Sequence, residues 1–332
     1  VVSYANPPAT LGSLAASSTE LFAIAPSTAT VYTLHDLNND GDALDFAEVL
    51  QYAQLPTGAH SPIATGLALA ADGTLYTLAP ARNLLYRIHD ANADGDALDF
   101  AEVLAIASAF TSPVAVTLRS DGSLLVTQNT STIPVRILRD RNADGDFLDF
   151  AENISYAESF APGANIVCMS PTLAYLARTS DASIVKLTDL TGDHDALDFA
   201  EVLTHATNLT GIAHLAIDAN DALLAASQAS VGSVYRVTDL NGDGDALDFA
   251  ETLLVAQAGS PILGLATVST ITPVCRKGDV NFDTLVNMAD IPLFSSIVIG
   301  ATTPADPCPA DVNDDGLIDG RDIRAFIVEI LP

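Results

Sequence analysis

Acidic residues recur at fixed intervals in five short segments of this 332-residue chain. The segments share the pattern Asp-x-Asn-x-Asp-Gly-Asp-x-x-Asp-x-x-Glu, with two departures in the fourth. Oxygen ligands at alternate positions, followed by a Gly that permits a sharp turn, let a chain wrap around one hard cation. Without a divalent ion, the clustered carboxylates would repel one another strongly. The pattern therefore predicts Ca2+ in each segment, in preference to Mg2+ and to the alternative of a solvated Asp-Gly turn.

We call these segments loops one to five; they span residues 36–48, 90–102, 140–152, 189–201 and 239–251. Positions 1, 3, 5, 7, 10 and 13 of each loop carry the expected metal ligands. In chain order these ligands are Asp36, Asn38, Asp40, Asp42, Asp45, Glu48, Asp90, Asn92, Asp94, Asp96, Asp99, Glu102, Asp140, Asn142, Asp144, Asp146, Asp149, Glu152, Asp189, Thr191, Asp193, Asp195, Asp198, Glu201, Asp239, Asn241, Asp243, Asp245, Asp248 and Glu251.

Loop four differs from the other loops at two ligand-shaping positions. Thr191 replaces Asn at position 3, and His194 replaces Gly at position 6. A Thr side chain supplies one oxygen, but a His at a turn position with positive φ is strained relative to Gly. We therefore expect loop four to bind calcium most weakly of the five.

Two more segments with metal-ligand spacing lie beyond residue 270, and each leads into an apolar run of helical length. Their expected ligands are Asp279, Asn281, Asp283, Asn287 and Asp290, and Asp311, Asn313, Asp315, Asp319 and Asp322. We expect one ion in each, which makes about seven Ca2+ in the whole chain. Such a load would reduce the formal charge of −29 to about −15.

The loops recur with a period of about 50 residues, which is typical of propellers and other repeat arrays. Within the second period, short apolar or alternating runs at 64–70, 74–78, 84–89 and 102–107 are separated by turn residues. These runs predict a four-stranded antiparallel sheet in which the acidic loop joins the third strand to the fourth. We therefore predict a mainly β fold, a five-bladed β-propeller over 1–270, with an open β-solenoid as the alternative.

Two known families resemble parts of this sequence. The pattern Ala-Asp-Gly-Thr-Leu-Tyr-Thr-Leu at 71–78, with an echo at 120–126, resembles the NHL and gluconolactonase-like propellers. The five acidic loops themselves resemble EF-hand calcium loops, although Glu falls at position 13 rather than 12 and no helix pattern flanks them.

The tandem segments within 271–332 resemble a type I dockerin module, a small α-helical domain. The resemblance implies two calcium ions, antiparallel helices and docking onto a cohesin-type partner. Thr284 departs from the Gly expected at position 6 of the first segment. Positions 10 and 11 usually contact cohesin in this family, and here Met288-Ala289 and Gly320-Arg321 do not match. A module that caps its own propeller is therefore the alternative.

The three cysteines bear on the cellular location. Cys275 and Cys308 lie just before the two C-terminal metal segments, so we predict a disulfide between them, with two free thiols as the alternative. Cys168 falls in an apolar run and is expected to be an inert buried thiol. A disulfide and calcium loops together predict a protein secreted by a bacterium to the extracellular space or cell surface.

The composition excludes several classes of partner. Acidic residues number 42 against 13 basic ones, so nucleic acids and anionic membranes are not expected to bind. The apolar runs are too short to insert into a membrane. The chain begins at Val1 without a signal-peptide pattern, so we expect a mature or trimmed form. Sequons at Asn129, Asn153 and Asn208 leave a glycan open.

No catalytic residue is predicted. The loops expected opposite the acidic ones are poor in ionisable groups, and His205 and His214 have no evident carboxylate partner. We therefore predict a secreted calcium-binding structural or interaction protein of an extracellular assembly. Its partner would be a cohesin-like receptor or further copies of itself. The alternative is a secreted propeller hydrolase or lactonase anchored through the dockerin-like module.

Two strand-like segments remain after five blades of four strands are counted. Residues 1–5 resemble a fourth strand, and 261–268 resemble a first strand, although five complete blades need neither. Unpaired strands leave main-chain groups that must be satisfied. Either both segments close the ring within one molecule, or one pairs with a neighbouring copy and builds a filament by strand donation.

Overall fold

The structure is a computed structural model, and two compact units divide the chain, Val1–Ser269 and Thr270–Pro332. The residues that it describes are 5, 8–17, 20–37, 43–45, 47–56, 66–218, 220–267, 278, 280, 286, 288, 290–299, 310, 312 and 317–330.

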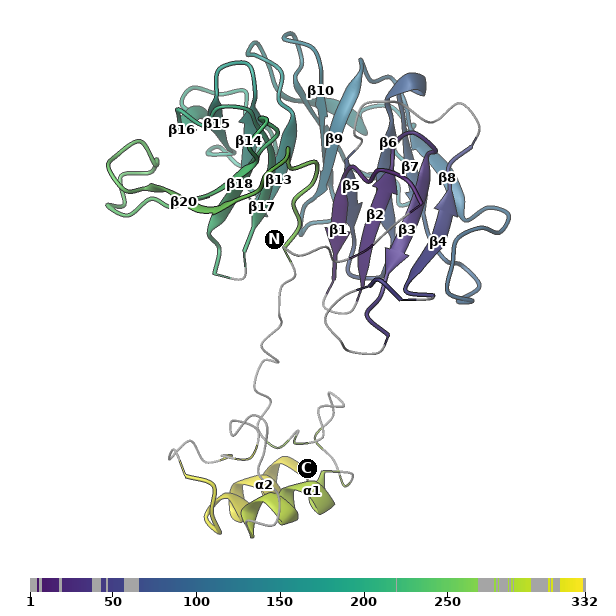
Figure 1. Ribbon diagram of the computed structural model, residues 1–332, viewed down its shortest axis with the longest axis vertical. Coiled ribbons are helices and arrows are strands. Elements are labelled where there is room, and N and C mark those ends of the chain that lie inside the picture. The colour runs from purple at the N-terminus through teal and green to yellow at the C-terminus, as the bar shows by residue number, and fades with distance from the viewer. Residues whose placement is uncertain are drawn as a thin grey trace. The chain divides into compact units, whose positions relative to one another are not determined.

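The first unit is built from five antiparallel sheets of four consecutive strands each (Figure 1), which confirms the predicted five-bladed propeller. We number these sheets as blades one to five. Their strands are β1 Leu14–Ala16, β2 Leu21–Ala25, β3 Thr30–Leu34 and β4 Val49–Gln54; β5 Leu67–Leu69, β6 Leu75–Ala79, β7 Leu84–Ile88 and β8 Val103–Ala107; β9 Pro113–Leu118, β10 Leu124–Gln128, β11 Val135–Leu138 and β12 Asn153–Ala157; β13 Asn165–Ser170, β14 Leu173–Arg178, β15 Ser183–Thr188 and β16 Val202–Ala206; β17 Ile212–Ile217, β18 Leu223–Ser227, β19 Ser233–Val237 and β20 Thr252–Gln257.

The core lies between successive blades. For example, Val31 and Tyr52 of blade one share a buried cluster with Leu75 and Ile88 of blade two. Strands buried on both faces explain why the sequence shows near-continuous apolar runs as well as alternating ones. The acidic loops join the third strand to the fourth in every blade, as predicted.

Each of loops two to five also bonds to the blade before it. The residue at position 8 donates its N–H to a bulged residue of the preceding fourth strand, at 2.7 Å in all four cases. These pairs are Ala97 with Tyr52, Phe147 with Ile106, Ala196 with Tyr156 and Ala246 with His205. The bulge leaves that carbonyl outside its own ladder, so it can accept a bond from the next blade. The acidic loops are therefore part of the seams between blades.

The segment 261–267 is not a strand, which corrects the prediction of a first strand at Pro261–Val268. It nevertheless lies beside blade five, because Ile262 donates its N–H to the Ser227 carbonyl at 3.2 Å. It also touches blade one, since a Cβ placed on Gly264 would lie 2.4 Å from the carbonyl oxygen of Gly12. A regular strand needs a hydrogen-bonding neighbour along its length, and no strand of the described residues pairs with 261–267.

The start of the chain is also placed on its own ring. Ala5 forms a parallel bridge with Ala43 of loop one, just as Ala53 does with Ala97 of loop two. Residues 1–4 lie outside the described part. The described portions of both terminal segments therefore support closure within one molecule over strand donation to a neighbour.

The described residues of the second unit include two helices, α1 Ile291–Val298 and α2 Asp322–Ile330. The rings of Phe294 and Phe326 stack between them with centroids 3.8 Å apart. The carboxyl Oδ1 of Asp290 accepts the N–H of Val280 at 3.0 Å and closes the start of α1 onto its loop. No helix among the described residues has both the length and the apolar character needed to cross a bilayer.

Candidate calcium sites

Position 1 of loops two to five holds an Asp that accepts several backbone N–H groups. In loop two, Asp90 Oδ1 accepts the N–H of Ala93 at 2.6 Å, and Oδ2 accepts that of Gly95 at 2.9 Å. The same arrangement recurs at Asp140, Asp189 and Asp239. Hydrogen bonds from the backbone, that of Gly95 above all, lower the pKa of the Asp90 carboxyl. Such an Asp stays charged and fixed in direction.

Positions 3, 5 and 10 come together in loops two, three and five. In loop two the amide Nδ2 of Asn92 donates to Asp94 Oδ2 at 3.0 Å and to Asp99 Oδ2 at 2.8 Å. The distances in loop three are 2.9 and 2.6 Å around Asn142, and those in loop five are 2.9 and 2.6 Å around Asn241. An electropositive amide group thus lies between two carboxylates, where a hard cation would be attracted. If the side-chain amide of the Asn were flipped by half a turn, its oxygen would occupy the place of Nδ2 between the two carboxylates.

Position 7 plays a different part. Asp96 Oδ1 accepts the N–H of Leu98 at 2.9 Å, and Asp146, Asp195 and Asp245 repeat this bond. The side chain therefore closes a tight turn of its own backbone, and the hydrogen bonds that gather positions 3, 5 and 10 do not include it. Its role as a metal ligand stays a prediction.

The Glu at position 13 braces the loop. Glu102 Oε1 accepts the N–H of Ala91 at 2.9 Å, and Oε2 accepts that of Asp99 at 3.0 Å. Glu48, Glu152, Glu201 and Glu251 make the same pair of bonds, and all five residues are buried. Its role as a metal ligand stays a prediction, and these contacts give it the further task of holding both ends of the loop.

The side chains at positions 1, 3, 5 and 10 can bind a metal through oxygen atoms only. Oxygen ligands suit calcium better than a softer metal. Among the described residues, no three Asp, Glu, His or Cys side chains gather closely enough to hold a metal by themselves. In loops two, three and five this agrees with the geometry, because the Asn amide separates the two nearest carboxylates.

Loop four is unlike the others in structure as well as in sequence. His194 has a φ of 77°, in the left-handed region where loops two, three and five have Gly. Thr191 has no amide to bridge Asp193 and Asp198, and Asp189 is the one buried Asp at position 1 among the described loops. These features agree with the expectation of a weak site, and the binding order itself stays a prediction.

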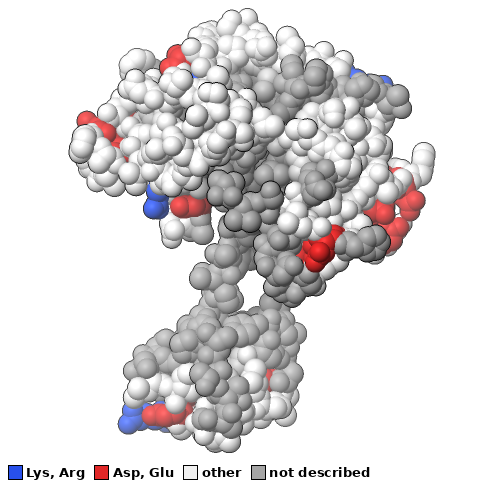
Figure 2. All heavy atoms as spheres, in the orientation of Figure 1, with Lys and Arg blue, Asp and Glu red and all other residues white. Residues whose placement is uncertain are grey.

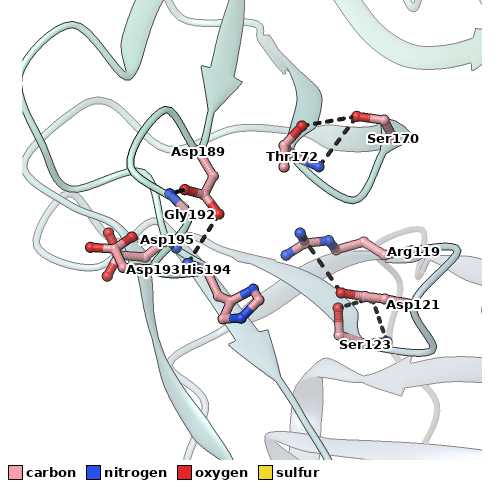
Figure 3. Close-up of polar contacts among 10 residues, drawn as sticks. All are labelled: Arg119, Asp121, Ser123, Ser170, Thr172, Asp189, Gly192, Asp193, His194 and Asp195. Atoms are coloured by element: carbon pink, nitrogen blue, oxygen red, sulfur yellow. Dashed lines mark hydrogen bonds and ion pairs between the residues drawn. The ribbon is translucent and has the colours of Figure 1, made fainter.

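The turn between β9 and β10 carries a buried Arg. Arg119 is only 2% exposed, and Figure 3 shows its guanidinium pointing toward the loop that carries Asp189 and His194. Its nearest ion-pair oxygen belongs to Asp121, at 3.9 Å, and its charge lies 5.7 Å from the centre of the Tyr156 ring. Among the described residues, its two terminal nitrogens have no hydrogen-bond partner. A buried guanidinium is stabilised by nearby negative charge, which Asp121 supplies here.

A strained turn that the sequence analysis missed follows position 10. The Ala at position 12 has a φ of 66 to 71° in all five loops, at Ala47, Ala101, Ala151, Ala200 and Ala250. This turn points the preceding Phe outward, so Phe100, Phe150, Phe199 and Phe249 are 99 to 101% exposed. The repeated triplet Phe-Ala-Glu was the available signal, because Ala is an unusual choice wherever it recurs between an exposed aromatic residue and a buried acid.

Several predicted ligands lie outside the described residues. They are Asn38, Asp40 and Asp42 of loop one, and Asp279, Asn281, Asp283, Asn287, Asp311, Asn313 and Asp315 of the second unit. Cys275 and Cys308 also lie outside, so their disulfide stays a prediction. Within the described part, Asp290 and Asp322 are buried, and Asp322 Oδ2 accepts the N–H of Asp319 at 2.9 Å. These bonds match the bracing role of position 13 in the propeller loops.

The axis of the ring offers little chemistry. A hollow of about 570 Å3 is lined by Thr10, Ser13, Asn165, Gln228 and other uncharged residues, with His214 as the one titratable side chain. Burial lowers the pKa of His214 to about 4, so its imidazole, which lies 2.8 Å from Gln228 Nε2, is neutral near pH 7. Cys168 is half-buried, which corrects the prediction of a buried thiol. Desolvation raises the pKa of this thiol to about 12, so little thiolate forms near pH 7.

The fold and these loops define a five-bladed β-propeller with an acidic loop in every blade. Residues 277–331 match the family described as the dockerin type I domain. The C-terminal unit is therefore a dockerin type I domain, as the sequence spacing indicates.

Solved structures similar to the chain are propellers with several different activities in their titles. Aldose sugar dehydrogenase from Streptomyces coelicolor, in a form with bound PQQ, is 13% identical with a TM-score of 0.52, covering 80% of this chain and 87% of that one. A putative gluconolactonase is 16% identical with a TM-score of 0.49, covering 75% and 77%. Virginiamycin B lyase from Staphylococcus aureus is 15% identical with a TM-score of 0.48, covering 74% and 71%. No curated protein matches the chain. At such identities the likeness concerns the fold alone.

Proposed function

We propose that this protein is a secreted, calcium-binding structural or interaction protein that its dockerin type I domain attaches to an extracellular or cell-surface assembly. The observation that carries the proposal is the repeated convergence of positions 3, 5 and 10 on one point in loops two, three and five. A single chance cluster of acidic side chains would not recur with the same bonds in separate blades. Most of the acidic side chains visible in Figure 2 also gather in separate clusters rather than spreading evenly.

Calcium in these loops would stiffen the ring as a whole. The same loop that gathers the carboxylates also donates the 2.7 Å bond to the preceding blade. Bare carboxylates repel one another and strain this bond, whereas an ion among them fixes the loop in its docked shape. We therefore assign calcium a structural role at the seams between blades and no catalytic role.

The dockerin type I domain supplies the attachment. Domains of this family dock onto cohesin-type proteins, which occur in secreted assemblies, and a surface between α1 and α2 supports a protein partner here. Ile299, Ile323 and Ile327 are exposed on this surface, although apolar side chains of this size usually pack in a core. The loss of exposed apolar area on docking would favour binding.

A hydrolase or lactonase remains the second candidate from the sequence, but no observation favours it. The axial hollow contains no carboxylate among its described lining residues, and its one His is neutral and bonded to an amide. Donation of a terminal strand to a neighbour is not part of the proposal either, because the described parts of both terminal segments contact their own ring.

The proposal is tested by two Asp-to-Asn substitutions within loop three. Asp144 lies at position 5 and contacts the central amide of Asn142, whereas Asp146 lies at position 7 and closes its own turn. We expect D144N to lower the calcium count by one in native mass spectrometry and D146N to leave the count unchanged. Equal counts in the wild-type chain and both variants, or no bound calcium in any of them, would contradict the proposal.

A further inference from the structure

A cationic side chain reaches the next acidic loop at two of the seams between the described blades. In blade two, Arg87 of β7 donates from Nη1 to the carbonyl of Gly145 in loop three at 3.2 Å. In blade four, Lys186 of β15 donates from Nζ to the carbonyl of Gly244 in loop five at 3.0 Å. Both cations are half-buried. Each of them joins a third strand to position 6 of the loop in the following blade.

Position 6 lies among the carboxylates of its loop. The N–H of Gly145 binds Oδ2 of Asp140, at position 1, at 2.9 Å, and the N–H of Gly244 binds Asp239 Oδ2 at 2.8 Å. The residues on either side of this Gly, at positions 5 and 7, are Asp in both loops. A cation bonded to the carbonyl of position 6 is therefore close to the acidic part of the loop, where it can offset negative charge.

The charges of Lys186 and of loop five act on the same buried group. The pKa of the His205 imidazole is lowered by burial and next by the charge of Lys186, whereas Asp245 and Asp239 of loop five raise it. Neither Lys186 nor Arg87 has an ion-pair partner of its own within 4.0 Å among the described residues. Their charge is therefore available to the acidic loops.

Loop two has the same ligand types and the same geometry without such a cation. The residue at the equivalent register is Thr33 of β3, which lies opposite Leu50 as Arg87 lies opposite Leu104. Asp90 nevertheless accepts the N–H groups of positions 4 and 6 at 2.6 and 2.9 Å, the same distances as in loop three. The position 8 bond is 2.7 Å in both loops. The cation therefore changes the charge at a loop and leaves its shape as it is.

We propose that Arg87 and Lys186 act as built-in counter-ions of loops three and five and lower the calcium affinity of these loops below that of loop two. A cation stabilises a loop of bare carboxylates more than a loop that already holds Ca2+, because the ion removes most of the negative charge. By linkage, the cation must then weaken calcium binding to the same extent. Loops three and five thus stay docked at calcium concentrations too low to fill them. This proposal rests on the calcium binding proposed above and deepens it.

The test compares calcium-binding isotherms of the full chain, measured at low salt in competition with a chromophoric chelator. We expect K186M to bind as many ions as the wild type, with one of them bound about fivefold more tightly, because the apolar stem is kept and the charge is lost. R87M should repeat this gain for loop three. K186R keeps the charge and should bind calcium like the wild type, since Arg87 makes the same kind of bond in blade two.

The matched control is R236M. Arg236 stands at the equivalent register of blade five, opposite Leu253, but its guanidinium pairs with Asp218 at 3.6 Å rather than with an acidic loop. We expect the isotherm of R236M to equal that of the wild type.

Thermal unfolding gives a second readout that a purely structural contact would not move. K186M should lower the melting temperature more in chelator than in excess calcium, because the counter-ion matters most to the bare loop. R236M should lower it equally in the two conditions. If Lys186 only held the seam together, K186M would bind calcium more weakly and lose the same stability in both conditions.

Calcium binding in K186M that is equal to or weaker than that of the wild type overturns the inference, and so does an equal gain in R236M. These outcomes leave the proposed function standing, because the chains still bind calcium. The absence of bound calcium in every chain, the wild type included, contradicts the proposed function together with this inference.

Discussion

The carboxylates of one acidic loop differ in what each of them does. Position 1 is fixed by backbone donors, positions 3, 5 and 10 surround one point, position 7 closes a turn and position 13 braces both loop ends. The sequence spacing predicts that positions 3 and 5 lie close together, because alternate residues on a tight turn share one side, and they do so in loops two, three and five. Their binding of a metal stays a prediction. It was not sufficient for position 13, since whether a Glu faces a metal or the backbone depends on the bulge and strained turn beside it.

The strained Ala at position 12 gives a prediction at the residue scale. A non-Gly residue in the left-handed region costs about 1 kcal/mol, whereas Gly adopts it without penalty. We expect A151G to raise the free energy of unfolding by about 0.5 kcal/mol in urea, after its larger unfolded-state entropy is subtracted. Ala157, in β12, is a fully buried strand residue and serves as the control. A157G should lower stability by about 1 kcal/mol, so a loss in both variants would contradict the strain.

His214 gives a pH dependence. Its folded pKa of about 4 lies below the ordinary value of 6.5, because burial disfavours the charged imidazole. The unfolded chain therefore binds more protons between these values, and stability falls as the pH decreases from 6.5 toward 4.

We expect the free energy of unfolding to fall by about 2 kcal/mol more in the wild-type chain than in H214N between pH 7 and pH 5. Both chains share the acidic loops, so their difference isolates His214. Parallel losses in urea titrations at the two pH values would show that this imidazole does not titrate as described.

At the scale of elements, the sequence predicted the four strands of each blade and the acidic loop between the third and the fourth. Short apolar runs between turn residues carry this information locally. The segment 261–267 shows why the remainder did not follow from the pattern. Its sequence resembles a first strand, but strand formation depends on a neighbouring strand that the local sequence does not contain.

The close approach of this segment to blade one is tested at Gly264. A Cβ there would lie 2.4 Å from the Gly12 carbonyl oxygen, a backbone atom that cannot turn away. We expect G264A to lower the free energy of unfolding by about 1 to 3 kcal/mol through overpacking. Gly259 has open space around its Cβ position and no positive φ, so G259A should be close to neutral. Equal effects of the two substitutions would argue against ring closure by 261–267.

At the scale of the whole molecule, we expect stability to depend on metal binding. Each loop that gathers carboxylates also forms a seam, so removal of calcium should weaken several seams at once. The number of blades and the position of the acidic loops were predictable from the sequence, because the same segment recurs five times. The exposure of Val255 in blade five, whose counterparts Tyr52, Ile106, Tyr156 and His205 are buried, was not predictable in this way. It depends on which blade is followed by another blade in three dimensions.

The central claim is tested most directly by thermal unfolding of the full chain at low salt, with excess calcium and with a chelator. Ligands that bind only the folded state stabilise it by mass action, and several sites act together. We expect chelation to lower the melting temperature by on the order of 10 °C, and Mg2+ to restore it only in part. A melting temperature that is the same with calcium and with the chelator would contradict the claim that calcium holds the blades together.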